Sequence, residues 1–192
     1  MSHDTDRFFI VTGGPGAGKT TLLDALEKAG FARTVEAGRA VIQDQVAISG
    51  PALPWRDPGL FAEAMFAWEM RSYRQALAEP GPVFFDRGIP DTIAYLRLME
   101  RPVPAHMMEA AAVFRYNPLV FVAPFWPEIF ANDAERKQTP EEAERTCAKL
   151  IETYRELGFD LAMLPLASVA ERVRFVLERT GPATSPRPPS GP

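Results

Sequence analysis

The amino-acid sequence predicts an α/β fold, a three-layer sandwich in which a five-stranded parallel β-sheet lies between helices on both faces. Three observations support this prediction. Short apolar segments alternate along the chain with longer segments of helical periodicity, which favours parallel strands joined by helices. Two of these segments, "VFFD" and "LVFVA", are apolar almost throughout, as strands covered on both faces are. No internal repeat is present, so a solenoid is not expected.

The first elements form a strand–helix–strand unit. The apolar segment 8–12 is the first strand, and a glycine-rich loop connects it to a helix at 18–29. Gly30 ends this helix, because glycine adopts the backbone conformation that a helix C-terminus needs. A short second strand is expected at 33–36.

The middle of the chain continues the alternation of helices and strands. Proline and glycine interrupt the helical pattern between residues 49 and 59, so one helix is expected before this segment and another after it. In chain order, the expected elements are helices at 37–48 and 60–78, a strand at 82–86, helices at 91–99 and 105–114, and a strand at 119–123.

The last part of the chain completes the sheet. A polar segment leads into a helix that ends at Gly158, and a strand at 161–164 and a helix at 168–180 follow. The proline-rich segment 181–192 lacks the apolar residues needed to fold and is predicted to be disordered. Residues 1–180 are therefore expected to form a single domain.

Composition narrows the class of protein. The chain has 192 residues, which suits one core, and a formal net charge of −4 without a run of lysine or arginine. A nucleic-acid partner is therefore not expected, and small molecules fit better. The single Cys147 excludes an intrachain disulfide, and no segment resembles an export signal or a membrane span. We expect a cytoplasmic protein without a membrane partner, and the oligomeric state is left open.

The sequence "GGPGAGKT" fits the pattern G-x-x-x-x-G-K-[ST], and it lies between a predicted strand and a predicted helix. Backbone N–H groups of such a loop, together with the N-terminus of the helix, form a cradle for polyphosphate. Lys19 would reach the β and γ phosphates of ATP, and Thr20 would contact Mg²⁺. The expected nucleotide-binding residues are Gly13, Gly14, Pro15, Gly16, Ala17, Gly18, Lys19, Thr20 and Thr21.

A phosphate-binding loop also needs an acid at the end of a neighbouring strand to hold Mg²⁺. Asp86 ends the strand at 82–86, whereas the strand at 119–123 ends without a carboxylate. Asp86 is therefore the candidate metal ligand and a candidate catalytic residue. The alternative is that Asp86 only begins a turn.

The remaining sequence argues against two classes of hydrolase. A remodelling motor would carry two acids at the strand end and a sensor asparagine, and neither is visible. A regulatory GTPase would carry the patterns D-x-x-G and N-K-x-D, which are missing.

Three segments then give the sequence a family resemblance. They are "DRGIPDTIAY" at 86–95, "TVEAGR" at 34–39 and the downstream "ERKQT". Together with the loop they resemble small-molecule kinases of the nucleoside and nucleoside-monophosphate kinase superfamily, and most closely the ribosylnicotinamide-kinase-like P-loop proteins often labelled predicted AAA-type ATPases. The resemblance covers about residues 7–180.

This resemblance implies a P-loop NTPase sheet in the order 2-3-1-4-5, with an acceptor bound between the ends of the second and third strands. It places Glu36 beside the acceptor hydroxyl as a general base. Arg39 and Arg87 would hold phosphate or acceptor, and Asp91 would contact polar groups of the acceptor. Carboxylates at adjacent strand ends also suit phosphoryl transfer on chemical grounds, because one can take the proton of the hydroxyl.

The resemblance also implies a cationic lid at about 131–140. Arg136 would then move onto the phosphates, and the segment that follows reads as the cap and first turn of a helix. The long helix at 60–78 is apolar on more than one face, so part of it could line an acceptor pocket with Trp55.

Each of these roles has a structural alternative. Glu36 could be a surface acid at a helix start, and Arg39 and Arg87 could form structural ion pairs. The lid charges could be solvated, and the aromatic residues could belong to the core.

We expect an ATP-dependent phosphotransferase that acts on a small-molecule hydroxyl or phosphate, with a nucleoside-like acceptor. A regulatory nucleotide-binding NTPase is the second interpretation, and the acidic composition disfavours a polynucleotide kinase.

Overall fold

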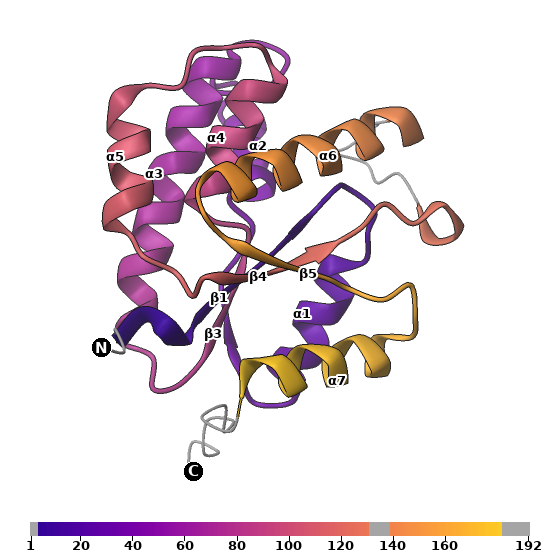
Figure 1. Cartoon of the computed structure of the whole chain (residues 1–192). Helices are drawn as coiled ribbons and strands as arrows, with labels where there is room; N and C mark the ends of the chain where they lie inside the picture. Colours follow the sequence, from indigo (N-terminus) through magenta and orange to yellow (C-terminus); the bar gives the residue numbers. More distant parts are fainter. Residues whose placement is uncertain (1–3, 131–138, 182–192) are drawn as a thin grey trace.

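The computed structural model of the chain describes residues 4–130 and 139–181, and in this part the chain forms three layers (Figure 1). The central sheet contains β1 (Phe8–Gly13), β2 (Ala32–Arg33), β3 (Val83–Asp86), β4 (Leu119–Ala123) and β5 (Asp160–Met163). Its order is β2-β3-β1-β4-β5 and all pairs are parallel. The fold class and the strand order expected above are confirmed.

The helices lie on both faces of the sheet. They are α1 (Lys19–Lys28), α2 (Ala37–Ala47), α3 (Pro58–Ala76), α4 (Ile89–Leu98), α5 (Ala105–Val113), α6 (Pro140–Glu156) and α7 (Val169–Thr180). Figure 1 shows α3 to α6 on one side of the sheet and α1 with α7 on the other. Two short 3-10 helices, Asp4–Arg7 and Pro127–Ile129, were not expected from the sequence.

The alternation of side chains along β1 explains the two-sided core. Successive residues of a strand point to opposite faces. Phe8 and Ile10 therefore pack into the cluster under α3 to α6, whereas Phe9 and Val11 pack into the cluster under α1 and α7. All residues of β1 are buried, so the strand that carries the glycine loop is anchored on both sides.

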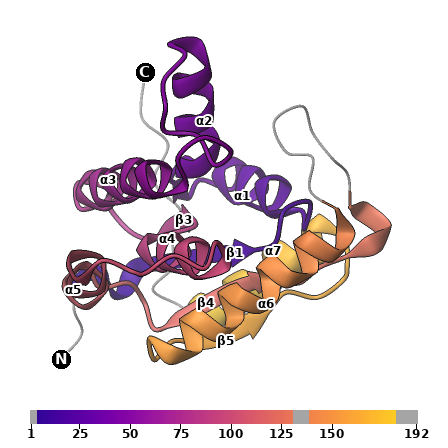
Figure 2. The same cartoon turned by 90° about the horizontal axis from the view of Figure 1, so that it is seen from above.

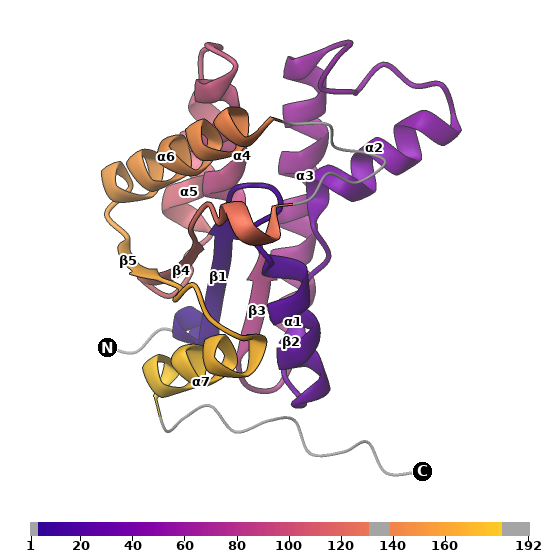
Figure 3. The same cartoon turned by 90° about the vertical axis from the view of Figure 1, so that its right-hand side faces the viewer.

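Helix α2 stands apart from both layers. Figures 2 and 3 show it projecting away from the sheet beside α3. It has a small apolar cluster of its own, in which Val41 and Ile42 pack with Leu53, Phe61 and Met65. The first turn of this helix therefore lies near the sheet, while its far end lies at the periphery.

Several boundaries differ from the sequence-based expectation. Strand β2 covers 32–33 rather than 33–36, although the Thr34 N–H still donates to the Phe84 oxygen at 3.0 Å before the chain turns into α2. Helix α3 begins at Pro58 rather than 60, because the Asp57 side chain caps it by accepting from the Leu60 N–H at 3.0 Å.

The lid expected at 131–140 lies outside the described residues except for its last two positions. Those two, Thr139 and Pro140, form the N-cap and first residue of α6. The predicted tail at 181–192 lies outside them except for Gly181. Within residues 4–130 and 139–181, no helix is long and apolar enough to cross a membrane.

Candidate active site

The glycine loop lies at the carboxyl end of β1, where ligands bind in open parallel sheets. Gly13 has φ 138°, and a Cβ there would lie 2.2 Å from the Ala123 oxygen, so no other residue fits against β4. Gly18 adopts the left-handed conformation, with φ 76°, at the N-cap of α1. The loop is thus held close to the sheet while its N–H groups lead into the helix N-terminus.

Lys19 lies across this loop. Its side chain is buried, and Nζ donates to the Gly13 oxygen at 3.2 Å and to the Gly14 oxygen at 3.0 Å. Thr20 and Thr21 are exposed at the start of α1. The ammonium and two hydroxyls are therefore grouped at the positive end of the helix.

Asp86 ends β3 beside the glycine-loop strand. It is paired in register with Val11, and its side chain is 4% exposed. Its backbone N–H donates to the Thr34 hydroxyl at 3.0 Å. This places a carboxylate at the same edge of the sheet as the loop, as the sequence predicted.

Arg87 connects two acids at this edge. Its Nε donates to Glu36 Oε1 at 3.0 Å, and its Nη1 donates to Asp91 Oδ1 at 2.9 Å. Burial alone would lower the pKa of Arg87, but the carboxylates of Glu36 and Asp91 raise it above its ordinary value. Arg87 also has φ 73°, a conformation that is strained for a side chain of this size. The surrounding contacts therefore hold the guanidinium in a fixed place.

Asp91 is the centre of the same network. Its Oδ1 accepts from Thr12 at 2.6 Å and from Arg87, and its Oδ2 accepts from the Gly88 N–H at 3.1 Å and from Tyr154 at 2.5 Å. A carboxylate has about four acceptor sites, and these donors use them. The arrangement favours a positioning role for Asp91 over the contact with an acceptor expected from the sequence.

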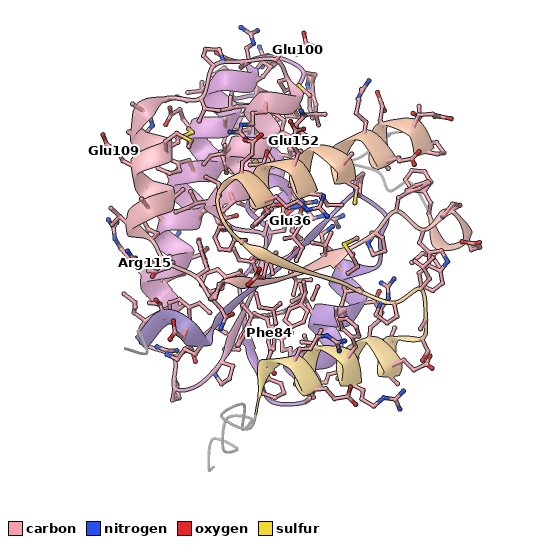
Figure 4. The ribbon with its side chains drawn as sticks, in the orientation of Figure 1. Glu36, Phe84, Glu100, Glu109, Arg115 and Glu152 are labelled. Atoms are coloured by element: carbon pink, nitrogen blue, oxygen red, sulfur yellow. The ribbon has the colours of Figure 1, made fainter. Side chains whose placement is uncertain are left out.

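Two cavities flank this network. The P-loop cavity, of about 470 Å³, is lined by the loop, Arg39, the start of α7 and the segment after β4. The α3–α4 cavity, of about 490 Å³, is lined mainly by apolar and aromatic residues of α3, α4 and the segment before α3. Pro15 and Glu36 line both cavities, so the two meet at these residues. Figure 4 shows Glu36 near the centre of the view, whereas Glu100 and Glu109 lie at the periphery.

The sequence also assigns the chain to a known protein family. A sequence profile of the AAA domain family matches residues 8–172, most of the chain. The chain belongs to this family. No curated protein matches it.

Solved structures resemble this AAA domain in fold. NadR protein in complex with NR aligns with a TM-score of 0.67 at 19% identity, over 97% of this chain and 55% of NadR. Deoxyadenosine kinase from M.mycoides, with dCMP and dCDP bound, aligns with a TM-score of 0.63 at 14% identity, over 90% of this chain and 97% of the kinase. The AAA domain described here therefore spans about half the length of NadR, and these likenesses confirm the kinase-like P-loop fold.

The AAA domain places the other residues predicted from the sequence in different parts of the site. Arg39 lines the P-loop cavity, one helical turn after Glu36, rather than the α3–α4 cavity. Trp55 lines the α3–α4 cavity and is 61% exposed, so it lies at the mouth. Arg136 lies outside the described residues, and its role stays a prediction.

Sequence reasoning missed Glu69 of the AAA domain. It lies on α3, lines the α3–α4 cavity and is 3% exposed. Burial, together with the charges of Asp91 and Asp86, raises the pKa of Glu69 well above its ordinary value, and Arg87 offsets this only in part. The signal was available, because Glu69 interrupts an apolar series with Phe61 and Met65 at a spacing of four residues.

Arg172 of α7 was also missed. Its Nη1 donates to the Ala17 oxygen in the glycine loop at 2.9 Å, and its Nε donates to the Pro165 oxygen at 2.9 Å. The guanidinium lies 4.8 Å from the centre of the Trp126 ring, in a cation–π contact. No local pattern indicates this role, because Ala17 and Arg172 are far apart in the sequence.

Proposed function

We propose that the protein is a kinase that transfers the γ-phosphoryl group of ATP to a hydroxyl of a small, nucleoside-like acceptor. The main support for this proposal is that the P-loop cavity and the α3–α4 cavity meet at Glu36 and Pro15. A switch that only hydrolyses a nucleotide has no need of a second cavity with aromatic walls beside its phosphate site. The fold shared with NadR and deoxyadenosine kinase, whose structures hold NR or deoxynucleotides, supports the same proposal.

In this proposal ATP binds in the P-loop cavity and the acceptor binds in the α3–α4 cavity. The loop N–H groups bind the phosphates, and Lys19 exchanges its contacts with the Gly13 and Gly14 oxygens for phosphate oxygens. Thr20 and Asp86 would hold Mg²⁺, which neutralises phosphate charge when bound. The Thr20 hydroxyl and the Asp86 carboxylate suit this ion, because Mg²⁺ prefers hard oxygen ligands.

Glu36 is proposed as the base. It is 8% exposed and lies where the two cavities join, so it can accept the proton of an acceptor hydroxyl as that oxygen bonds to phosphorus and the bond to ADP breaks. Arg87 holds the Glu36 carboxylate through its Nε, and Asp91 holds Arg87 in turn. This chain of contacts fixes the position of the base before the substrates bind.

The charge of the α3–α4 cavity favours a hydroxyl acceptor over a phosphate acceptor. Among the described residues that line it, Glu36, Asp91 and Glu142 are acidic, Arg87 supplies the positive charge, and the raised pKa of Glu69 leaves that group out of the count. Two of those acids already contact Arg87. An acceptor that carries phosphate would therefore meet net negative charge.

We also propose a cytoplasmic location, because Cys147 is a free, buried thiol, which suits a reducing compartment.

An acceptor panel tests this function. ADP release would be measured with ATP and Mg²⁺ in the presence of single nucleosides, their monophosphates and simple sugars, against a blank without acceptor. We expect one or more nucleosides to stimulate ADP release and to yield a phosphorylated product by mass spectrometry. If no compound raises ADP release while the protein hydrolyses ATP alone, the regulatory NTPase interpretation replaces the kinase.

A further inference from the structure

The inner wall of the α3–α4 cavity carries two polar groups that the phosphoryl-transfer chemistry leaves unused. One is the carboxyl group of Glu69, which continues the line of Phe61 and Met65 along one face of α3. The other is the hydroxyl of Tyr95 on α4, whose ring packs edge-on against Phe61 at 5.3 Å. Both groups lie among apolar residues of α3 and α4, while other charged residues, such as Arg87 and Asp91, also line the cavity.

The surroundings of Glu69 determine its protonation. Asp91 faces it from the first turn of α4, Arg87 from the turn before that helix, Asp86 from the end of β3, and Glu36 from the N-cap of α2. Tyr116, which follows α5, interacts with it as well. Burial and the three acids raise its pKa, so a neutral carboxyl group is favoured. A neutral carboxyl presents one donor and one acceptor side by side.

The hydroxyl of Tyr95 needs a partner. Its oxygen is buried and accepts or donates no hydrogen bond within residues 4–130 and 139–181. Burial raises the pKa of Tyr95 to about 12, so the group remains a hydrogen-bond donor at neutral pH. Buried polar groups in native proteins are nearly always paired, and an orphaned one marks a place where a water or a ligand completes the pairing.

Three charged groups that line this cavity, Glu36, Arg87 and Asp91, are already engaged with one another. Asp91 accepts four hydrogen bonds from protein donors, and Arg87 is held between two carboxylates. Glu36 faces the junction with the P-loop cavity. An acceptor whose hydroxyl meets Glu36 would therefore extend its remaining part toward Glu69 and Tyr95.

We propose that Glu69 and Tyr95 determine acceptor specificity by binding the base of a nucleoside, and that this base presents a hydrogen-bond donor and acceptor on neighbouring atoms. Amides and aminopyrimidines have such an edge. Glu69 pairs with it through both oxygens, and the Tyr95 hydroxyl donates to a further acceptor atom. Phe61 and Met65 cover the faces of the ring. The inference rests on the proposed kinase function and adds the recognition of the acceptor to it.

Two variants at Glu69 separate its chemistry from its size. Glu69→Gln keeps a donor and an acceptor in nearly the same shape, whereas Glu69→Leu keeps the volume and removes both. Glu63 lies on the same helix with its side chain 45% exposed, so Glu63→Leu is the matched control. Tyr95→Phe removes one hydroxyl and leaves the ring contact with Phe61.

The acceptors are chosen in the same way. Uridine, cytidine, inosine, adenosine and nicotinamide riboside present paired donor and acceptor atoms, and C-phenyl ribonucleoside has the same sugar without them. Binding would be measured by calorimetry with the full chain, and kcat and KM by ADP release. Binding does not depend on turnover, so the two proposals are tested separately.

We expect the best natural nucleoside to exceed C-phenyl ribonucleoside in kcat/KM by at least about a hundredfold. Glu69→Leu should raise KM for that nucleoside by about ten- to a hundredfold and leave C-phenyl ribonucleoside unaffected, whereas Glu69→Gln should stay within about threefold of the wild type. Tyr95→Phe should raise KM by up to about tenfold without lowering the melting temperature, because its hydroxyl has no partner among the described residues.

Other outcomes overturn one proposal or the other. Equal losses for both classes of nucleoside in Glu69→Leu would assign Glu69 to packing, and a loss in Glu69→Gln as large as in Glu69→Leu would rule out a neutral pair. A drop in melting temperature for Tyr95→Phe would show a structural partner. Nucleoside binding without turnover, still sensitive to Glu69, would refute the kinase and keep this inference. If no nucleoside binds, both fail.

Discussion

At the scale of single residues, the site depends on one chain of charges from Glu36 through Arg87 to Asp91. Glu36 lies at the junction of the two cavities, and the other two residues hold it there. The middle residue carries a strained backbone, which persists only because its contacts on both sides over-determine its place. The two ends of this chain therefore differ in what their substitution should do.

Glu36→Gln should lower phosphorylation of an acceptor by about 10² to 10⁴, the usual effect of a positioned base. Hydrolysis of ATP alone should survive, because water enters the site without help from a base directed at the acceptor. Both rates would be measured side by side, as phosphorylated product and as ADP without acceptor. A parallel collapse of both rates would mean that Glu36 activates water instead.

Asp91→Asn should act on stability. The amide nitrogen would face donors that now point at a carboxylate oxygen, and Arg87 would lose a buried partner. We expect the free energy of unfolding to fall by about 3–5 kcal/mol. Urea denaturation measures this, with Asp44→Asn on the exposed side of α2 as the control. A midpoint equal to the wild type would show that the four hydrogen bonds to Asp91 contribute little.

At the scale of elements, α7 supports the glycine loop from a distant part of the sequence. Arg172→Met should leave the Ala17 oxygen without its donor, and a buried unpaired group costs about 1–3 kcal/mol. The glycine loop should then be less ordered before ATP binds, so ATP affinity should fall by about tenfold while acceptor KM is unchanged. Calorimetry would compare it with Arg174→Met, whose side chain is 69% exposed. A larger effect on the acceptor than on ATP would contradict this role.

The elements also show what the sequence could reveal. The strands followed from uninterrupted apolar runs, and the loop from a pattern contained in eight residues. The sequence predicts the start of α3 two residues too late, because proline usually interrupts a helix, whereas Pro58 lies in the first turn, where proline is well tolerated. Strand β2 is shorter than the sequence predicts. It lies at the edge of the sheet with β3 as its one neighbour, and the chain soon turns into α2.

The parts of the site that the sequence did not reveal depend on contacts between distant segments. Arg172 contacts Ala17 across 155 positions, and no spacing rule connects them. Glu69 gains its raised pKa only when the ends of β3, α2 and α4 surround it. Glu36 and Arg87 were predicted separately, but only the fold shows that they are bonded to each other.

At the scale of the whole molecule, the buried acid should make stability depend on pH. The folded state raises the pKa of Glu69, so between its unfolded and folded values the folded protein binds more protons than the unfolded chain. Stability should therefore fall as pH rises through this window. Relative to Glu69→Gln, the wild type should lose free energy of unfolding in urea titrations as the pH is raised above 4.5, the ordinary pKa of the group. A constant difference over that range would show that Glu69 ionises normally.

Helix α2 packs through a cluster of its own rather than through the clusters on the two faces of the sheet. The segment from α2 to the start of α3 carries Trp55 and Phe61, which line the α3–α4 cavity, yet it contributes little to the folding core. Substitutions in this segment should therefore change which ligand the α3–α4 cavity binds, while the glycine loop and its sheet stay folded.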